Sequence, residues 1–131
     1  MNLLLDTHIW LWSLLAPDKL APAVAARLES SENELWLSPI TTWEALVLIE
    51  KGRVEIDGDP IRWIGDAVRA IPFHEAALTH EVAVESRRLK LPHRDPADRF
   101  LAASAKVYEL TLVTADERLL ASDEFPVLAN R

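Results

Sequence analysis

Hydrophobic residues along this chain follow two patterns, short continuous runs and longer stretches with an apolar residue at every third or fourth position. Continuous apolar runs predict buried strands at residues 2–5, 35–37, 110–113 and 126–128. Helical spacing predicts helices at residues 7–15, 17–30, 39–52, 61–71, 78–89 and 96–108, and a short helix from residue 116. Short buried strands alternating with helices predict an α/β fold, a parallel sheet flanked by helices on both faces.

Two of the helix starts carry a double signal, a capping side chain and the proline after it. Ser38 precedes Pro39, and Asp95 precedes Pro96. Serine and aspartate accept hydrogen bonds from the first free N–H groups of a helix, and proline fits its first position. These pairs therefore fix where the helices at 39–52 and 96–108 begin.

Composition is that of an ordinary globular protein, with 131 residues of which 50% are hydrophobic and 27% are charged. At this length we expect one domain over residues 1–131. The absence of cysteine excludes a disulfide scaffold, a thiol nucleophile and a cysteine-ligated zinc or iron–sulfur site. Because we find no secretory signal and no bilayer-length apolar segment, we expect a soluble cytoplasmic domain.

The formal net charge of −7 argues against a protein that coats nucleic acid through bulk charge. It does not exclude a nuclease, whose acidic residues must gather at one place. The sequence has no glycine-rich phosphate loop and no GxSxG motif, which removes nucleotide-binding and serine-hydrolase interpretations. The histidines lack HExxH spacing, so we expect no metal ligand among His8, His74, His80 and His93.

Two acidic residues directly follow predicted strands. Asp6 comes after residues 2–5, and Asp116 comes soon after residues 110–113. Ligands of open α/β sheets bind at this end of the strands. Each aspartate is also explained as the N-cap of the helix that follows it.

Two further acids lie within predicted helices. Glu44 stands between Ile40 and Leu48 on an apolar stripe, where an unpaired carboxylate is costly or takes up a proton. We therefore expect a basic partner or a metal ion beside it. Asp98 lies in the first turn of its helix, where a favourable interaction with the helix dipole is the alternative explanation. Asp95 is better explained as the cap of that helix.

A parallel sheet can bring these four acids together at one edge. Carboxylates 4 Å apart repel by roughly 4 kcal/mol at an effective dielectric near 20, so such a cluster requires a polyvalent cation. Oxygen ligands without cysteine or paired histidine favour Mg²⁺ or Mn²⁺ over zinc.

Four motifs occur here in a characteristic order: Asp6-Thr7-His8-Ile9-Trp10-Leu11-Trp12, Thr42-Trp43-Glu44-Ala45, Asp95-Pro96-Ala97-Asp98-Arg99-Phe100-Leu101-Ala102-Ala103 and Thr114-Ala115-Asp116. With them the chain resembles a PIN domain over essentially its whole length, and specifically the VapC-type toxins of bacterial toxin–antitoxin modules. Each motif alone has low specificity, whereas the ordered set at this length is a strong signal.

The resemblance implies a Rossmann-like PIN-domain fold and an endoribonuclease that depends on Mg²⁺ or Mn²⁺. The family's catalytic and metal-binding acids match Asp6, Glu44, Asp98 and Asp116. Asp98 is preferred to Asp95 because the apolar-Ala-Ala stretch begins three residues after it. Possible accessory positions are Asp95, Thr7 and Thr114, although capping explains Thr7 equally well.

A mechanism follows from this assignment. A cation held by Asp6 and Asp98, with Glu44 and Asp116 helping directly or through water, would polarise the scissile phosphate. It would also lower the pKa of a bound water, which then attacks in line. Whether one or two ions act is left open.

The resemblance also implies three partners: an RNA substrate, a cognate antitoxin protein and a second copy of the chain in a homodimer. We expect the antitoxin to use a hydrophobic groove near the early helices, with a basic side chain reaching the acidic site. Two alternative functions are a receiver-like phospho-accepting signalling domain and a catalytically silent PIN-like binding module. The receiver is disfavoured because Asp6 stands alone after its strand and no lysine follows the late strand.

Basic residues crowd the segment that leads into Asp98, namely Arg87, Arg88, Lys90, His93, Arg94 and Arg99. Positive charge beside an acidic centre suits RNA phosphate contacts on an otherwise anionic protein. An equally weighted explanation is a solvated helix end stabilised by the helix dipole.

Overall fold

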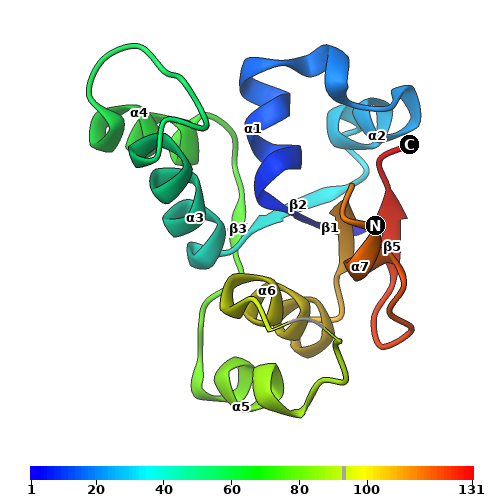
Figure 1. Cartoon of the computed structure of the whole chain (residues 1–131). Helices are drawn as coiled ribbons and strands as arrows, with labels where there is room; N and C mark the ends of the chain where they lie inside the picture. The colour runs from blue at the N-terminus through cyan, green and yellow to red at the C-terminus, as the bar shows by residue number, and fades with distance from the viewer. Residues whose placement is uncertain (93) are drawn as a thin grey trace.

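The computed structural model describes residues 1–92 and 94–131, and its central element is a parallel sheet (Figure 1). The strand order is β3-β2-β1-β4-β5, and each neighbouring pair is parallel. The strands are β1 (Asn2–Leu5), β2 (Glu34–Leu37), β3 (His74–Glu75), β4 (Thr111–Thr114) and β5 (Val127–Ala129). The predicted fold class is confirmed.

Helices cover both faces of this sheet. They are α1 (Thr7–Leu15), the 3₁₀ turn η1 (Pro17–Lys19), α2 (Pro22–Glu29), α3 (Pro39–Glu50), α4 (Pro60–Arg69), α5 (His80–Arg88), α6 (Pro96–Val107) and α7 (Glu117–Leu120). In Figure 1, α5 and α6 lie below the sheet, and α1 and α2 lie above it. Among the described helices, none is both long and apolar enough to cross a bilayer.

Successive side chains of β1 point to opposite faces of the sheet, and each face has its own hydrophobic core. Leu4 packs with residues of α5 and α6 on one face, whereas Leu3 and Leu5 pack with residues of α1, α2, α3 and α4 on the other. All three leucines are buried. A continuous apolar run is therefore what a central strand covered on both faces requires.

The predicted helix at residues 17–30 is wrong in its first third. The chain forms η1 and then restarts as α2 at Pro22. Proline has no N–H to donate and disfavours helical geometry in the residue before it, and Ala21 is extended, with φ −59° and ψ 142°. The stripe of Leu20, Val24 and Leu28 nevertheless packs into one core.

Other differences are small. The two-residue strand β3 was not predicted, and Ile71 and Leu78 lie outside helices, both exposed. The caps Ser38 and Asp95 are confirmed, since each side chain accepts a backbone N–H of its helix.

Parallel connectivity determines where the functional side chains lie. Each strand runs toward the same edge of the sheet, so the residues after β1 and β4 meet there. The N–H of Asp6 still donates to the carbonyl of Val113 at 3.0 Å, which places Asp6 at the last rung beside β4.

Candidate active site

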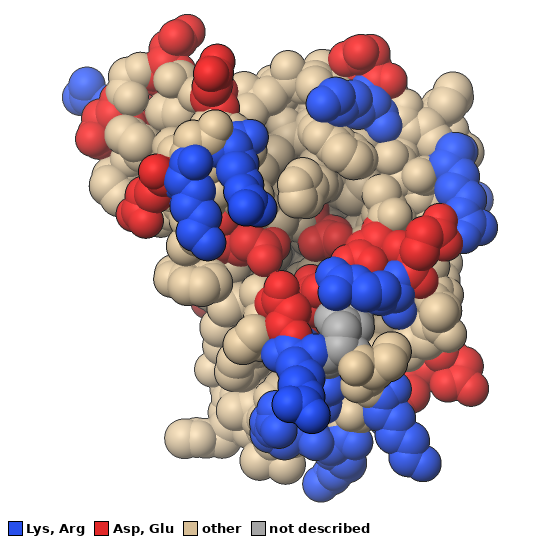
Figure 2. Space-filling model, viewed as in Figure 1, with Lys and Arg blue, Asp and Glu red and all other residues tan. Residues whose placement is uncertain are grey.

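A cleft of about 510 Å³ opens where β1 and β4 end. Its lining residues are Asp6, His8, Trp12, Glu44, Leu48, Arg53, Asp95, Asp98, Ala115, Asp116 and Arg118. Figure 2 shows acidic side chains within a hollow and basic side chains around its rim. Each of the four acids assigned by the sequence analysis to metal binding lies on this cleft, with Asp95 beside them.

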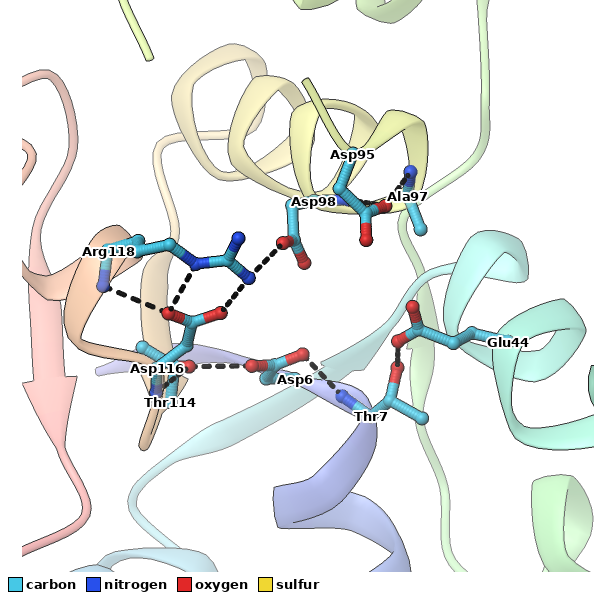
Figure 3. A network of polar contacts seen from close by, with 9 residues as sticks. All are labelled: Asp6, Thr7, Glu44, Asp95, Ala97, Asp98, Thr114, Asp116 and Arg118. Atoms are coloured by element: carbon cyan, nitrogen blue, oxygen red, sulfur yellow. Dashed lines mark hydrogen bonds and ion pairs between the residues drawn. The ribbon is translucent and has the colours of Figure 1, made fainter. Parts of the chain in front are cut away.

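Asp6 is fixed by contacts at both oxygens. One oxygen accepts from the N–H of Thr7 at 2.7 Å, and the other accepts from the hydroxyl of Thr114 at 2.6 Å. Asp6 thus caps α1 and faces the cleft at the same time (Figure 3). Burial raises the pKa of this carboxyl, and the two hydrogen bonds oppose that change.

Glu44 reaches the cleft from α3. Its carboxylate accepts the hydroxyl hydrogen of Thr7 at 2.5 Å, and burial raises the pKa of Glu44. In the described part of the chain it forms no ion pair with a lysine or arginine. Of the two partners expected for Glu44, the structure therefore does not supply the basic one.

Asp98 reaches the cleft from the first turn of α6. It is only 7% exposed, and its pKa is raised to about 7. The main cause is burial, followed by the charges of Asp95 and Asp6. Asp95 itself accepts the N–H groups of Ala97 and Asp98 at 2.9 and 3.4 Å, as the cap prediction requires.

Asp116 caps α7 and also faces Asp98. Its carboxylate accepts the N–H of Arg118 at 2.9 Å, and its own N–H donates to the Thr114 hydroxyl at 3.0 Å. Asp116 therefore serves as a helix cap and lines the cleft at the same time (Figure 3). The same holds for Asp6.

Arg118 is a site residue that the sequence reasoning missed. Its guanidinium donates to both carboxylate oxygens of Asp116, at 3.3 and 3.0 Å, and lies 3.5 Å from Asp98. Its position in the sequence could have indicated this role, because Arg118 lies in the first turn of a helix capped by Asp116 and its side chain can therefore reach the capping carboxylate. His8, Trp12 and Arg53 also line the cleft without having been assigned to it.

The carboxylate oxygens of the cleft are the ligand type that hard divalent cations prefer. Because burial disfavours the charged form of Asp6 and Asp98, a bound cation would stabilise these two carboxylates strongly. Within residues 1–92 and 94–131, no three His, Asp or Glu side chains form a ready-made metal cluster. Binding of one ion by several of these acids thus requires side-chain movement or bridging water. Arg118 already provides a cation between two of them.

The basic segment divides into two groups. Arg87, Arg88, Lys90 and Arg94 are exposed, and the guanidinium of Arg88 also lies 3.5 Å from Glu85. Arg99 of α6 is instead buried and donates to the carbonyls of Ser86, Leu89 and Leu91. These hydrogen bonds link α6 to the end of α5 and the residues after it. The structure does not support the predicted phosphate contact for Arg99. His93 lies outside the described residues.

Comparison with known proteins gives a consistent result. A PIN domain family model matches residues 3–124. Ribonuclease VapC22 of Mycobacterium tuberculosis is 30% identical over 121 residues, which cover 90% of this chain and 89% of that protein.

Solved structures share the fold at lower identity. VapBC2 from Rickettsia felis, bound to a DNA fragment from its promoter, aligns with a TM-score of 0.74 and 14% identity, covering 98% of both chains. DNA-bound VapBC from Salmonella typhimurium aligns with a TM-score of 0.70 and 16% identity, again over 98% of both chains.

Proposed function

Because this chain belongs to the PIN-domain family, we propose that it is a metal-dependent endoribonuclease and the toxin of a toxin–antitoxin module. The observation that carries the proposal is the convergence of Asp6, Glu44, Asp98 and Asp116 on one cleft. These four side chains come from the ends of two strands and from two helices, and no helix-capping requirement explains Glu44 or Asp98. We also propose that residues 1–131 act as one domain.

In the proposed mechanism, Asp6 and Asp98 would be the principal ligands of Mg²⁺ or Mn²⁺, and Glu44 and Asp116 would assist directly or through water. The chemistry supplied by the bound ion is polarisation of the phosphate and easier ionisation of the attacking water. Asp98 must lose its proton before it binds a cation, and its pKa of about 7 makes this a step that occurs near neutral pH.

Two threonines act as positioning residues in this scheme. Thr114 donates to Asp6, and Thr7 donates to Glu44 while its N–H holds Asp6. These bonds fix the direction in which the two carboxylates present their remaining lone pairs. The accessory role assigned to the two threonines is thus orientation of the acids.

RNA contact is assigned to the exposed basic side chains, Arg87, Arg88, Lys90 and Arg94. They lie on the last turn of α5 and the segment before α6, whose first turn carries Asp98. Phosphates on either side of the cleaved bond need such charges next to an acidic centre.

A cognate antitoxin and a second copy of the chain are the proposed protein partners, and the cytoplasm is the proposed location. A toxin–antitoxin complex from Klebsiella pneumoniae shares this fold, with a TM-score of 0.68 and 19% identity, which supports an antitoxin partner. An apolar cavity of about 250 Å³ lies between α1, η1, α2 and the segment after α4, lined in part by Trp10, Leu14, Leu20, Leu28 and Phe73. This cavity supports the predicted antitoxin groove near the early helices.

The family match removes support for a receiver-like domain, and a silent binding module becomes the outcome that the decisive experiment tests. Protein freed of antitoxin is incubated with a mixed RNA pool with and without Mn²⁺, and cleavage ends are mapped. Cleavage that requires Mn²⁺ and is absent in Asp98→Asn supports the proposal. Intact RNA with a folded, Mn²⁺-binding protein establishes the silent module instead.

A further inference from the structure

Arg118 occupies the position between two acids that the proposed function assigns to the metal. Its guanidinium lies 3.0 Å from an oxygen of Asp116 and 3.5 Å from an oxygen of Asp98 (Figure 3). The two acids come from different elements, the loop after β4 and the first turn of α6. One side chain therefore links the two walls of the cleft.

The helix does not need this side-chain contact. Asp116 caps α7 through the backbone N–H of Arg118, at 2.9 Å, so the cap survives if the guanidinium is removed. The side chain of Arg118 is 57% exposed and is not a packing element of either core. Its one evident role is electrostatic, opposite carboxylates that burial and mutual repulsion destabilise.

We propose that Arg118 is a built-in counter-cation of the cleft, which competes with the divalent ion for Asp98 and Asp116. This inference rests on the proposed function, because it assigns those two acids to metal binding. Carboxylate oxygens that hold a guanidinium cannot at the same time present those lone pairs to a metal ion, and two cations at that separation repel. Metal binding at this wall therefore requires Arg118 to leave.

Exposure makes this exchange feasible. A half-exposed arginine exchanges its ion pairs for water at a small free-energy cost. Without metal, Arg118 reduces the repulsion among the acids and stabilises the empty fold. With metal, the guanidinium is released toward solvent at the mouth of the cleft.

The test compares wild type with Arg118→Gln, Arg118→Lys and Arg131→Gln. Arg131 is a matched control, because it is another exposed arginine that pairs with a residue of α7, Glu117, at 2.7 Å. It does not line the cleft. Mn²⁺ affinity is measured by titration calorimetry on the antitoxin-free protein. Thermal unfolding is measured at pH 8 with a chelator.

We expect Arg118→Gln to bind Mn²⁺ roughly five- to tenfold more tightly than wild type, and to unfold at a lower temperature when metal is absent. The Mn²⁺ affinity of Arg118→Lys should lie between those of wild type and Arg118→Gln. Lysine keeps the positive charge but cannot donate to both carboxylate oxygens of Asp116 as the guanidinium does. Arg131→Gln should match wild type in Mn²⁺ affinity. Equal or weaker Mn²⁺ binding by Arg118→Gln overturns the inference.

Failure of the inference and failure of the proposed function give different results. Unchanged affinity in Arg118→Gln, with Mn²⁺-dependent RNA cleavage intact, removes only the role of Arg118. Absence of Mn²⁺ binding in wild type and in Arg118→Gln, together with uncleaved RNA, overturns both.

Discussion

Two clusters of acidic side chains in this molecule behave in opposite ways. In the cluster between α5, α6 and the segment before β5, Lys106 lies 3.1 Å from buried Glu85 and 3.0 Å from Glu124. Arg88 adds a second cation 3.5 Å from Glu85, and hydrogen bonding to Lys106 lowers the pKa of Glu124. Here charge is balanced, and the cluster ties helices together.

In the acidic cleft the pKa values of three carboxyl groups are raised and not lowered. Burial raises the pKa of Asp6, Glu44 and Asp98, and the neighbouring carboxylates raise the pKa of Asp98 further. Acids maintained in an environment that penalises their charge mark a site with a task other than stability. The direction of the pKa shift therefore separates the two clusters more clearly than the number of acids does.

The largest expected difference between the clusters is in catalysis. Asp6→Asn or Asp98→Asn should lower RNA cleavage by roughly 10³-fold or more, because each removes a charge that the mechanism needs for its cation. Both variants should remain folded, since asparagine keeps the shape and removes a repelling charge. Cleavage rates with Mn²⁺ and circular dichroism measure the two effects.

The matched variant for that experiment is Glu85→Gln, which removes an equally buried acid from the balanced cluster. Its cleavage rate should stay at the wild-type level. Wild-type cleavage by Asp6→Asn and Asp98→Asn would remove both aspartates from the mechanism.

The second difference is in how stability responds to pH. The pKa of Asp98 is about 7 in the folded protein against an ordinary 3.8, so between these values the folded state binds the extra proton. Stability without metal should thus fall as pH rises from about 4 to about 7, and the melting temperature at pH 8 should be roughly 5 °C below that at pH 5. Asp6 and Glu44 act in the same direction.

Two comparisons isolate the cleft in that measurement. Asp98→Asn should show a smaller decrease, because the titrating group is gone, and saturating Mn²⁺ should raise the wild-type melting temperature at pH 8. A pH profile that Asp98→Asn leaves unchanged would assign the effect to other groups.

A smaller effect is expected from the balanced cluster. Glu85→Gln should destabilise the fold by about 1–2 kcal/mol, because it replaces charged hydrogen bonds to Lys106 and Arg88 at a buried position. Urea unfolding measures this, with Glu81→Gln, at an exposed position of α5, as the control. If Glu85→Gln proves as stable as Glu81→Gln, the balanced cluster has no stabilising role.

Much of the architecture could be predicted because its signals are local. The apolar run at residues 2–5 and the caps Ser38 and Asp95 each encode one element in a few adjacent residues. Convergence of Asp6 and Asp116 then followed from the parallel topology, since they follow neighbouring strands, whereas Glu44 and Asp98 join them from helices.

What the sequence did not reveal depends on contacts between distant segments. The strand β3 consists of two exposed residues and exists only because β2 offers an edge to pair with. Arg99 and Arg118 are both arginines near acids in sequence, yet one turns inward to three carbonyls and the other turns to the cleft. The packing of α5 against α6 decides the direction of Arg99, and the position of α7 beside the first turn of α6 decides that of Arg118.

The smallest predicted effect concerns the exposed basic residues of the segment before α6, where an RNA contact and a solvated helix end were equally good explanations. In an Asp98→Asn background, which prevents cleavage, Lys90→Gln and Arg94→Gln should each weaken RNA binding a few-fold at low salt. Each lost phosphate contact should also reduce the slope of log affinity against log salt by about 0.7, the value for single strands. Arg69→Gln is the control, because Arg69 is exposed on α4 and pairs with Asp66 there. If both test variants keep the slope of the Arg69→Gln control, these charges only solvate the segment, and RNA must be held by other residues of the cleft rim such as Arg53.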